Sequence, residues 1–302
     1  MLFSEAQAAG SLLRVACDGA DVGAEITING VFKGECPLDI QVNPGSIQLR
    51  VVKRVDASRE RVFEQEFRMG DGVVKKVDAV LSAPQLNAAA KRRVEAEFAA
   101  LRQAAEAGDA KAMFSLAYRY EQGQGVAQSD ALANDWYRKA ADAGNSDAMT
   151  NLGFRHKFGK GVPPDGEAAV TWYRRAAEAG NPTAMNNLAA EYLNGKSVPR
   201  DVAEAIRWFE QSAAAGYVEA ATNLAFNYAS GTVLPKNDAL ALEWYRKAAD
   251  GGSARAMYGL GTLYANGRGV ARDGEEAVRW YRAAAAKSYS PAIEELKKRG
   301  LQ

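Results

Sequence analysis

The side chains that perform acid–base or nucleophilic chemistry are few in this chain. Its one histidine, His156, has none of the partners at helical spacing that a general base or a metal ligand requires. Gly195-Lys196-Ser197 looks like the end of a phosphate-binding loop, but Ala190 stands where such a loop needs a glycine. The serine-nucleophile motif G-x-S-x-G does not occur. We therefore expect neither catalysis nor a bound cofactor or metal.

The two cysteines, Cys17 and Cys36, lie close together near the start of the chain. Without histidines beside them, two thiols cannot complete a four-ligand zinc site. They flank one predicted hairpin, which favours a disulfide between them. The alternative is two buried thiols in a reducing cytosol. A disulfide would indicate an oxidising compartment.

A strict spacing of 36 residues organises the C-terminal two-thirds of the chain. Every tryptophan follows it: Trp136, Trp172, Trp208, Trp244 and Trp280. Glycine, leucine and alanine series keep the same spacing and define five full units and a sixth half unit. Such a repeat predicts a solenoid, in which each unit buries its apolar surface only against its neighbours.

Each unit reads as two helices. In the second unit the first helix is expected from Asp147 to a left-handed glycine, Gly159. The second is expected from about Glu167 to Ala179. Alanine and glycine positions allow the helices to approach closely, and Trp and Tyr fill the gap to the next unit. His156 occupies a slot that holds tyrosine in four other units, so it is expected to be a partly buried aromatic substitute.

The unit A-M-x-N-L-x-x-x-Y-x-x-G followed by A-x-x-W-Y-R-K-A-A-x-x-G resembles the Sel-one-like repeat, a relative of the tetratricopeptide repeat. The resemblance covers about residues 106–300. It implies a right-handed α-solenoid of the kind whose members mostly act as protein–protein adaptors, many of them in the bacterial envelope or in signalling. Some members carry a cysteine pair in every repeat, and the absence of cysteine from this array excludes that subgroup.

Residues 11–83 differ in character, because β-branched residues alternate with polar ones between turn signals. Asn29-Gly30 and Pro44-Gly45 mark tight turns between predicted strands. The pattern predicts a small antiparallel β-sandwich. The whole chain is therefore expected to be an α+β multidomain protein.

The same segment resembles the PEGA domain. The motif of that family, V-x-V-D-G-x-x-x-G-x-T-P-L followed by a strand and P-G, is matched from Ala24 to Gly45. Asn29 stands for the usual aspartate and Cys36 for the usual threonine. The resemblance implies a binding or spacer module of bacterial envelope proteins, and the departure at Cys36 supports its pairing with Cys17. The alternative is that the glycines and prolines only set loop geometry.

These patterns give the expected organisation of the chain. Its parts are 1–10, a leader remnant or flexible tail; 11–83, the PEGA-like sandwich; 84–107, a linker and capping helix; 108–287, five repeats; and 288–302, a C-terminal capping helix. Ala6-Gln7-Ala8 resembles a signal cleavage site but lacks the preceding charged and apolar regions. No apolar run reaches the length of a membrane-spanning helix.

In tetratricopeptide-type arrays the first helix of each unit lines the concave face, and the resemblance implies the same here. The side chains expected on that face are Phe114, Tyr118, Asn151, Phe154, Arg155, Asn187, Glu191, Asn223, Phe226, Asn227 and Tyr258. The recurring asparagines suit hydrogen bonding to an extended peptide backbone. Alternatively, they bond within or between repeats.

The expected function is a non-catalytic scaffold that binds a protein or peptide in this groove, in the bacterial periplasm or envelope; a cytoplasmic location is the alternative. Balanced charge, 38 basic against 37 acidic residues, argues against a nucleic-acid partner. A second hypothesis is a glycan- or peptidoglycan-associated envelope protein whose aromatic residues stack on sugars. A third is a hydrolase of β-lactam-like substrates, an activity attached to some cysteine-rich relatives.

Overall fold

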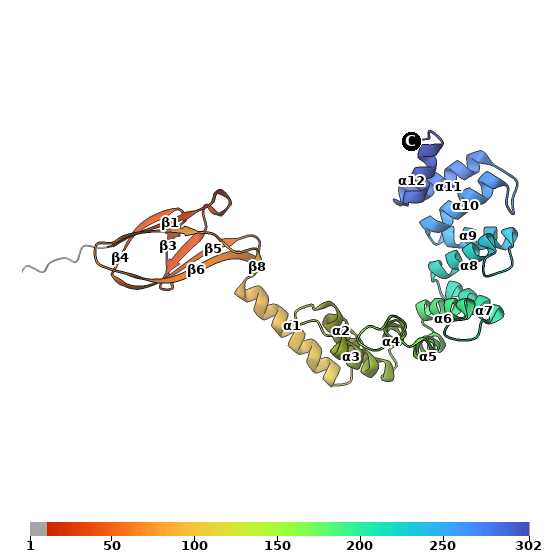
Figure 1. Cartoon of the computed structure of the whole chain (residues 1–302), viewed down its shortest axis with the longest axis horizontal. Coiled ribbons are helices and arrows are strands. Elements are labelled where there is room, and N and C mark those ends of the chain that lie inside the picture. The colour runs from red at the N-terminus through yellow and green to blue at the C-terminus, as the bar shows by residue number, and fades with distance from the viewer. Residues whose placement is uncertain (1–10, 302) are drawn as a thin grey trace, which may run out of the picture. The chain divides into compact units, whose positions relative to one another are not determined.

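The computed structural model describes residues 11–301 and divides into two compact units, Met1–Ala99 and Ala100–Gln302 (Figure 1). The first is a β unit and the second is a helical array, as the sequence predicted. The leader remnant or tail expected over residues 1–10 lies outside the described residues. Within residues 11–301 no helix is both long enough and apolar enough to cross a lipid bilayer.

The β unit contains two sheets. The three-stranded sheet has the order β4 (Leu38–Val42), β1 (Ser11–Cys17), β7 (Val74–Ala79). The five-stranded sheet has the order β3 (Val31–Glu35), β2 (Glu25–Ile28), β5 (Gly45–Arg54), β6 (Arg59–Met69), β8 (Gln85–Leu86). Alternate residues of β5 point inward, and Ile47 and Leu49 join Leu13 and Val15 of β1 in one buried cluster. Side chains from both sheets therefore share one core, which confirms the sandwich.

One strand pair departs from the antiparallel pattern. β1 runs parallel to β7, with Leu12 opposite Val74 and Val15 opposite Val77, whereas every other strand pair among the described residues is antiparallel. Alternation of apolar and polar residues predicts that a strand has a buried face but carries no information on strand direction. The tight hairpin between β2 and β3 was predicted, and Asn29 and Gly30 both have positive φ there.

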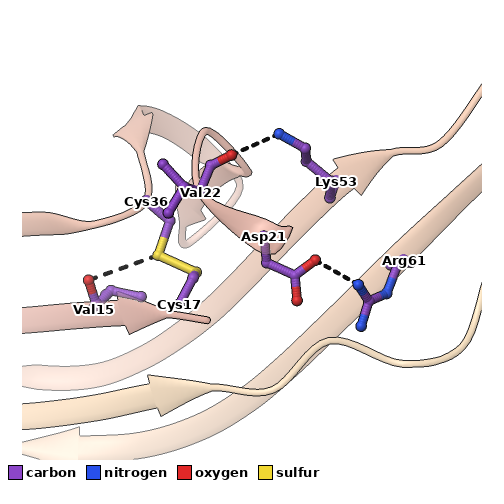
Figure 2. Close-up of a disulfide and its surroundings, with 7 residues drawn as sticks. All are labelled: Val15, Cys17, Asp21, Val22, Cys36, Lys53 and Arg61. Atoms are coloured by element: carbon purple, nitrogen blue, oxygen red, sulfur yellow. Dashed lines mark hydrogen bonds and ion pairs between the residues drawn. A yellow bond between two sulfur atoms is a disulfide. The ribbon is translucent and has the colours of Figure 1, made fainter. Parts of the chain in front are cut away.

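A disulfide joins Cys17 at the end of β1 to Cys36 just after β3 (Figure 2). The two Cα atoms are 6.1 Å apart. Beside it, the buried carboxylate of Asp21 accepts a hydrogen bond of 2.8 Å from Arg61 Nη1, and Lys53 Nζ donates to the carbonyl of Val22 at 2.6 Å. The bond and these polar contacts fix the segment between β1 and β2 to the five-stranded sheet.

The helical array is built from five pairs of helices, all 13 residues long. The first helices of the pairs are α2 (Ala110–Gln122), α4 (Ser146–Phe158), α6 (Pro182–Asn194), α8 (Val218–Ser230) and α10 (Ala254–Asn266). The second helices are α3 (Asp130–Asp142), α5 (Gly166–Glu178), α7 (Val202–Ala214), α9 (Asp238–Asp250) and α11 (Gly274–Ala286). The flanking helices are α1 (Ala88–Glu106) and α12 (Ser290–Lys298).

Helix ends follow the sequence signals. The side chain of Asn181 accepts from the backbone N–H of Ala184 at the start of α6, and Pro182 occupies the first turn. Gly159 ends α4 in the left-handed conformation, with φ of 68°. Both features were predicted from the repeat, and a left-handed glycine ends each of the five first helices.

In each pair, a small residue of the first helix contacts an aromatic ring of the second helix, which lets the two helices pack closely. A Cβ added to Gly153 would lie 2.5 Å from the ring of Tyr173, and one added to Gly261 would lie 2.6 Å from Tyr281. The same repeat position holds buried alanine in the other three units. Any larger side chain there would force the helices apart.

The tryptophans are less buried than this inner aromatic series. Four of the five are half-buried, and only Trp208 is buried. Cationic groups lie over their rings: Lys139 Nζ is 4.0 Å from the ring centroid of Trp136, and Arg175 Cζ is 4.4 Å from that of Trp172. The tryptophans therefore cover the outer side of the core and partly face water, with cation–π contacts across their rings.

Two charged residues expected on the exposed groove are buried instead. Arg155 is 1% exposed, and its guanidinium binds Glu121 Oε1 at 2.8 Å, Asp130 Oδ1 at 2.5 Å and Asn134 Oδ1. Glu191, one repeat later, is 2% exposed and pairs with Lys157 Nζ at 2.5 Å. The helix turns this position toward the preceding repeat, so these charges bind repeats to one another and are not available to a partner.

The disulfide yields a stability prediction. Cys17→Ser with Cys36→Ser opens a loop closed across 19 positions, which should cost the β unit about 3 kcal/mol of unfolding free energy. All tryptophans lie in the array, so calorimetry should record a lower β-unit transition while the tryptophan-fluorescence transition stays unchanged. An equal shift in both transitions would contradict this assignment.

The buried guanidinium yields a second prediction. Arg155→Ala leaves Glu121, Asp130 and Asn134 without their shared donor. The array should lose about 2–3 kcal/mol, less than a fully buried pair costs, because both carboxylates keep part of their surface in water. Urea unfolding followed by tryptophan fluorescence measures this loss. The matched control is Arg282→Ala, since Arg282 is exposed and forms no ion pair within residues 11–301; a similar loss there would refute the interpretation.

Candidate functional site

The exposed sides of the first helices form a surface that we call the groove face. Three aromatic side chains at one repeat position stand on it: Tyr118 of α2, Phe154 of α4 and Phe226 of α8, with 43%, 45% and 46% of their surface exposed. Ala190 and Thr262 occupy this position in the third and fifth repeats. Phe154 contacts Phe158 and Phe226 contacts Arg255, yet each ring keeps a large exposed surface, so we take the three as candidates for partner contacts.

The asparagines of the groove face bond to the array itself. Asn223 Nδ2 donates to Asn186 Oδ1 at 3.0 Å, and its Oδ1 accepts from Arg255 Nη1 at 3.1 Å. Asn187 Oδ1 accepts from Asn186 Nδ2 at 3.3 Å. The bonds of Asn223 run to the two neighbouring repeats, and that of Asn187 stays within its own helix, which agrees with the second of the two interpretations that the sequence left open. Asn151, Asn187 and Asn227 are each half-buried.

A cavity of about 270 Å³ opens on the groove face between α8 and α10. We call it the α8–α10 pocket. Its walls include Phe226, Tyr245, Arg255, Tyr258, Arg268 and Tyr289. The sequence had placed Phe226 and Tyr258 on this face, and the structure brings them together here. Phe114, also expected on the groove, instead packs its half-buried ring against Tyr137, with ring centroids 5.6 Å apart.

A glycine makes room for this pocket. Gly259 occupies the repeat position of Asn151, Asn187 and Asn223. A Cβ at Gly259 would lie 2.6 Å from the ring of Tyr245, so no larger residue fits while that ring stays in place. Because the fifth repeat has no side chain here, the ring of Tyr245 forms part of the pocket wall. Sequence reasoning missed Gly259, although its departure from the asparagine series was the available signal.

Of the two arginines in the pocket, one is paired with a carboxylate and the other is not. Arg268 is neutralised, because it forms an ion pair with Asp238 and its Nε lies 3.1 Å from Asp238 Oδ1. Arg255 forms no ion pair within the described part of the chain. Its guanidinium lies 4.9 Å from the ring centroid of Phe226 and is held by Asn223. It is thus an oriented cation without a counter-charge.

The remaining groups in the pocket are neutral. Burial raises the pKa of Tyr245, against the opposing effect of Arg255 and Arg268, so its phenol stays protonated at physiological pH. The ring of Tyr258 lies 5.5 Å from that of Tyr281 and 5.6 Å from that of Tyr289, centroid to centroid. Aromatic walls beside one unpaired cation suit a ligand in which an apolar group is joined to a negatively charged group.

The residues that suggested chemistry in the sequence also meet in one place. His156, Lys196 and Ser197 line a shallow cavity of about 660 Å³. Burial lowers the pKa of His156, which keeps its imidazole neutral. The hydroxyl of Ser197 donates to Glu191 Oε2 at 3.0 Å and is thus bonded to a carboxylate, not to the imidazole. Among residues 11–301 no three His, Cys, Asp or Glu side chains gather as a metal site would require.

Comparisons with known proteins bear on the array. A sequence profile of the Sel1 repeat matches residues 110–145, 146–181, 182–217, 218–253 and 254–289. A comparison with curated protein sequences gave no significant match.

Two solved structures are similar to the chain. A Sel1 repeat protein from Oxalobacter formigenes is 33% identical with a TM-score of 0.59, over 67% of this chain and 88% of that one. The protein c5321, a protective antigen of uropathogenic Escherichia coli strains, is 37% identical with a TM-score of 0.61, over 65% of this chain. The chain spans only 42% of the length of that antigen. With five contiguous repeats matched across 180 of 302 residues (289 − 110 + 1), the chain belongs to the Sel1 repeat family.

Proposed function

We propose that the chain is a non-catalytic scaffold that binds a segment of another protein along the concave groove face of its array. Sel1 repeat proteins generally serve as protein-interaction scaffolds. The observation that carries the proposal is the register of exposed rings at Tyr118, Phe154 and Phe226. Aromatic side chains supply large contact areas and dominate the binding energy of many interfaces.

The cell envelope is the proposed location. The disulfide between Cys17 and Cys36 supports it, because such bonds persist in oxidising compartments and are rare in the cytosol. The β unit, whose turns match the PEGA-like motif at Asn29-Gly30 and Pro44-Gly45, would serve there as a spacer or a second binding module. The cytosol is a reducing environment in which disulfides are rare, so this bond argues against a cytoplasmic location.

Glycan binding is the second candidate, and a separate observation favours it. A cavity of about 410 Å³ on the outer face of the five-stranded sheet is lined by polar side chains, including Gln48, Arg50, Glu64 and Glu66. Amides, carboxylates and guanidinium groups can donate to or accept from sugar hydroxyls. Binding of peptidoglycan fragments to the β unit, with no effect from changes on the groove face, would favour this candidate over the first.

Site-specific photo-crosslinking tests the scaffold proposal. A benzophenone amino acid replaces Phe154 or Phe226 in the native host, and Arg282 is replaced as the exposed control on α11. The two groove positions should give discrete adducts with the same partner, identified by mass spectrometry, and the control should not. Adducts at all three positions, or at none, would argue against the groove face as the binding surface.

A triple alanine variant tests whether the exposed rings are needed for the crosslinked adducts to form. Tyr118→Ala, Phe154→Ala and Phe226→Ala together should abolish adduct formation from a probe at the neighbouring exposed position Ser115. The unfolding free energy should change by no more than about 0.5 kcal/mol per site, because each ring is exposed. A large loss of stability would mean that the rings serve packing, and the proposal would lose its main support.

A further inference from the structure

The volume and the lining of the α8–α10 pocket indicate which kind of protein segment it can bind. Its volume, about 270 Å³, lies below the ~300–1,000 Å³ typical of sites for drug-sized molecules. It therefore suits one residue better than a cofactor or a large metabolite. Four aromatic rings form part of its walls, those of Phe226, Tyr245, Tyr258 and Tyr289. An apolar side chain that enters it exchanges water for these rings.

The unpaired positive charge at the pocket favours an anionic ligand. Arg255 carries the one guanidinium of the pocket that no carboxylate neutralises within residues 11–301. Asn223 Oδ1 accepts a hydrogen bond from Nη1, and the guanidinium carbon lies over the ring of Phe226. The other N–H groups of the fork remain for an acceptor. A planar fork oriented in this way matches the two oxygens of a carboxylate.

We propose that the α8–α10 pocket captures the C-terminal residue of a partner polypeptide, with the terminal carboxylate on Arg255 and an apolar side chain among Phe226, Tyr258 and Tyr289. The chemistry of a chain end favours this occupant over an internal acidic residue. At a chain end, one Cα carries both a carboxylate and an apolar side chain. In Asp or Glu the carboxylate ends the side chain itself, and no apolar group is left to fill the aromatic pocket.

The fifth repeat is the one that provides this arrangement. The positions of Arg255 in the other repeats hold Lys111, Asp147, Thr183 and Glu219, and those of Gly259 hold Ser115 or asparagine. The pocket therefore arises where the array departs from its own consensus. The inference rests on the proposed scaffold function, since it places one end of the bound segment at the C-terminal end of the groove face.

The test uses the full chain and an array of N-acetylated octapeptides with randomised last three residues, each made with a free carboxylate and as the amide. We expect bound peptides to end in Phe, Tyr, Leu, Ile or Met. Amidation should weaken binding about 10-fold or more, as expected for loss of a charge-assisted hydrogen bond. Arg255→Gln should weaken the free acids equally and the amides little, whereas the exposed control Arg282→Gln should change neither.

Other outcomes separate this inference from the scaffold proposal. Peptides that bind equally as acids and amides, and that respond to Phe154→Ala but not to Arg255→Gln, would overturn the end-capture inference and leave groove binding in place. Dependence on Arg255 with internal Asp or Glu selected, and no effect of amidation, would also overturn it. If no peptide binds while photo-crosslinks from Phe154 persist, end capture is wrong; if the crosslinks are absent too, both proposals fail.

Variants of the pocket residues need a control for correct folding. Gly259→Asn introduces the residue of the second, third and fourth repeats and should fill the pocket, but its Cβ would approach the ring of Tyr245. Tyr258→Ala removes a pocket wall without this clash. Each variant is used only if its tryptophan-fluorescence transition matches that of the wild type. Unchanged affinity and an unchanged preference for an apolar last residue in a folded Tyr258→Ala protein would contradict the role assigned to the aromatic wall.

Discussion

The array depends on a close contact between a small residue of each first helix and an aromatic ring of the helix that follows. Gly153 with Tyr173 and Gly261 with Tyr281 are its tightest examples, because no Cβ fits between the backbone and the ring. Buried leucines, such as Leu188 and Leu224, complete the same layer. Since this contact recurs in every repeat, the stack of repeats buries a continuous core.

That contact also determines which residues are free to vary. The packing positions face inward and hold the same residue classes throughout, whereas the groove face carries residues that packing does not need. Phe226 and Arg255 belong to this second group and meet between α8 and α10, where the buried Gly259 leaves room for the pocket. A solenoid gains a specific site in this way: the framework repeats, and a few departures on one face set the shape and charge of a pocket.

The sequence predicted most of the framework because its signals are local and repeat. Helix starts at Asn181-Pro182 and helix ends at Gly159 follow from capping chemistry, and the hairpin at Asn29-Gly30 follows from turn chemistry. The parallel pairing of β1 with β7 lies beyond such signals, because strand direction depends on chain topology. The tryptophans were expected to fill the gaps between units; they pack against the core, and four of the five rings also partly face water.

The candidate site was predicted less well, because burial of a polar residue depends on neighbours that are distant in sequence. Arg155 and Glu191 sit on the first helices at a position that looks exposed, but the preceding repeat covers them and supplies their partners. Arg255 was missed for the opposite reason. A single arginine on a helix carries no sequence signal of a pocket, and only the structure places it beside Phe226 without a counter-charge.

Arg255 and Gly259 of the fifth repeat differ from the residues at their positions in the other repeats, and we propose that the pocket beside them binds a carboxylate. The most direct measurement is an NMR titration of the full chain, observing arginine Nε–Hε signals while N-acetyl-L-phenylalanine is added. We expect a saturable shift of the Arg255 signal, absent with the corresponding amide, while the signals of Arg155 and Arg282 stay fixed. Equal shifts of all exposed arginines, or no shift at Arg255 up to the solubility limit of the ligand, would contradict it.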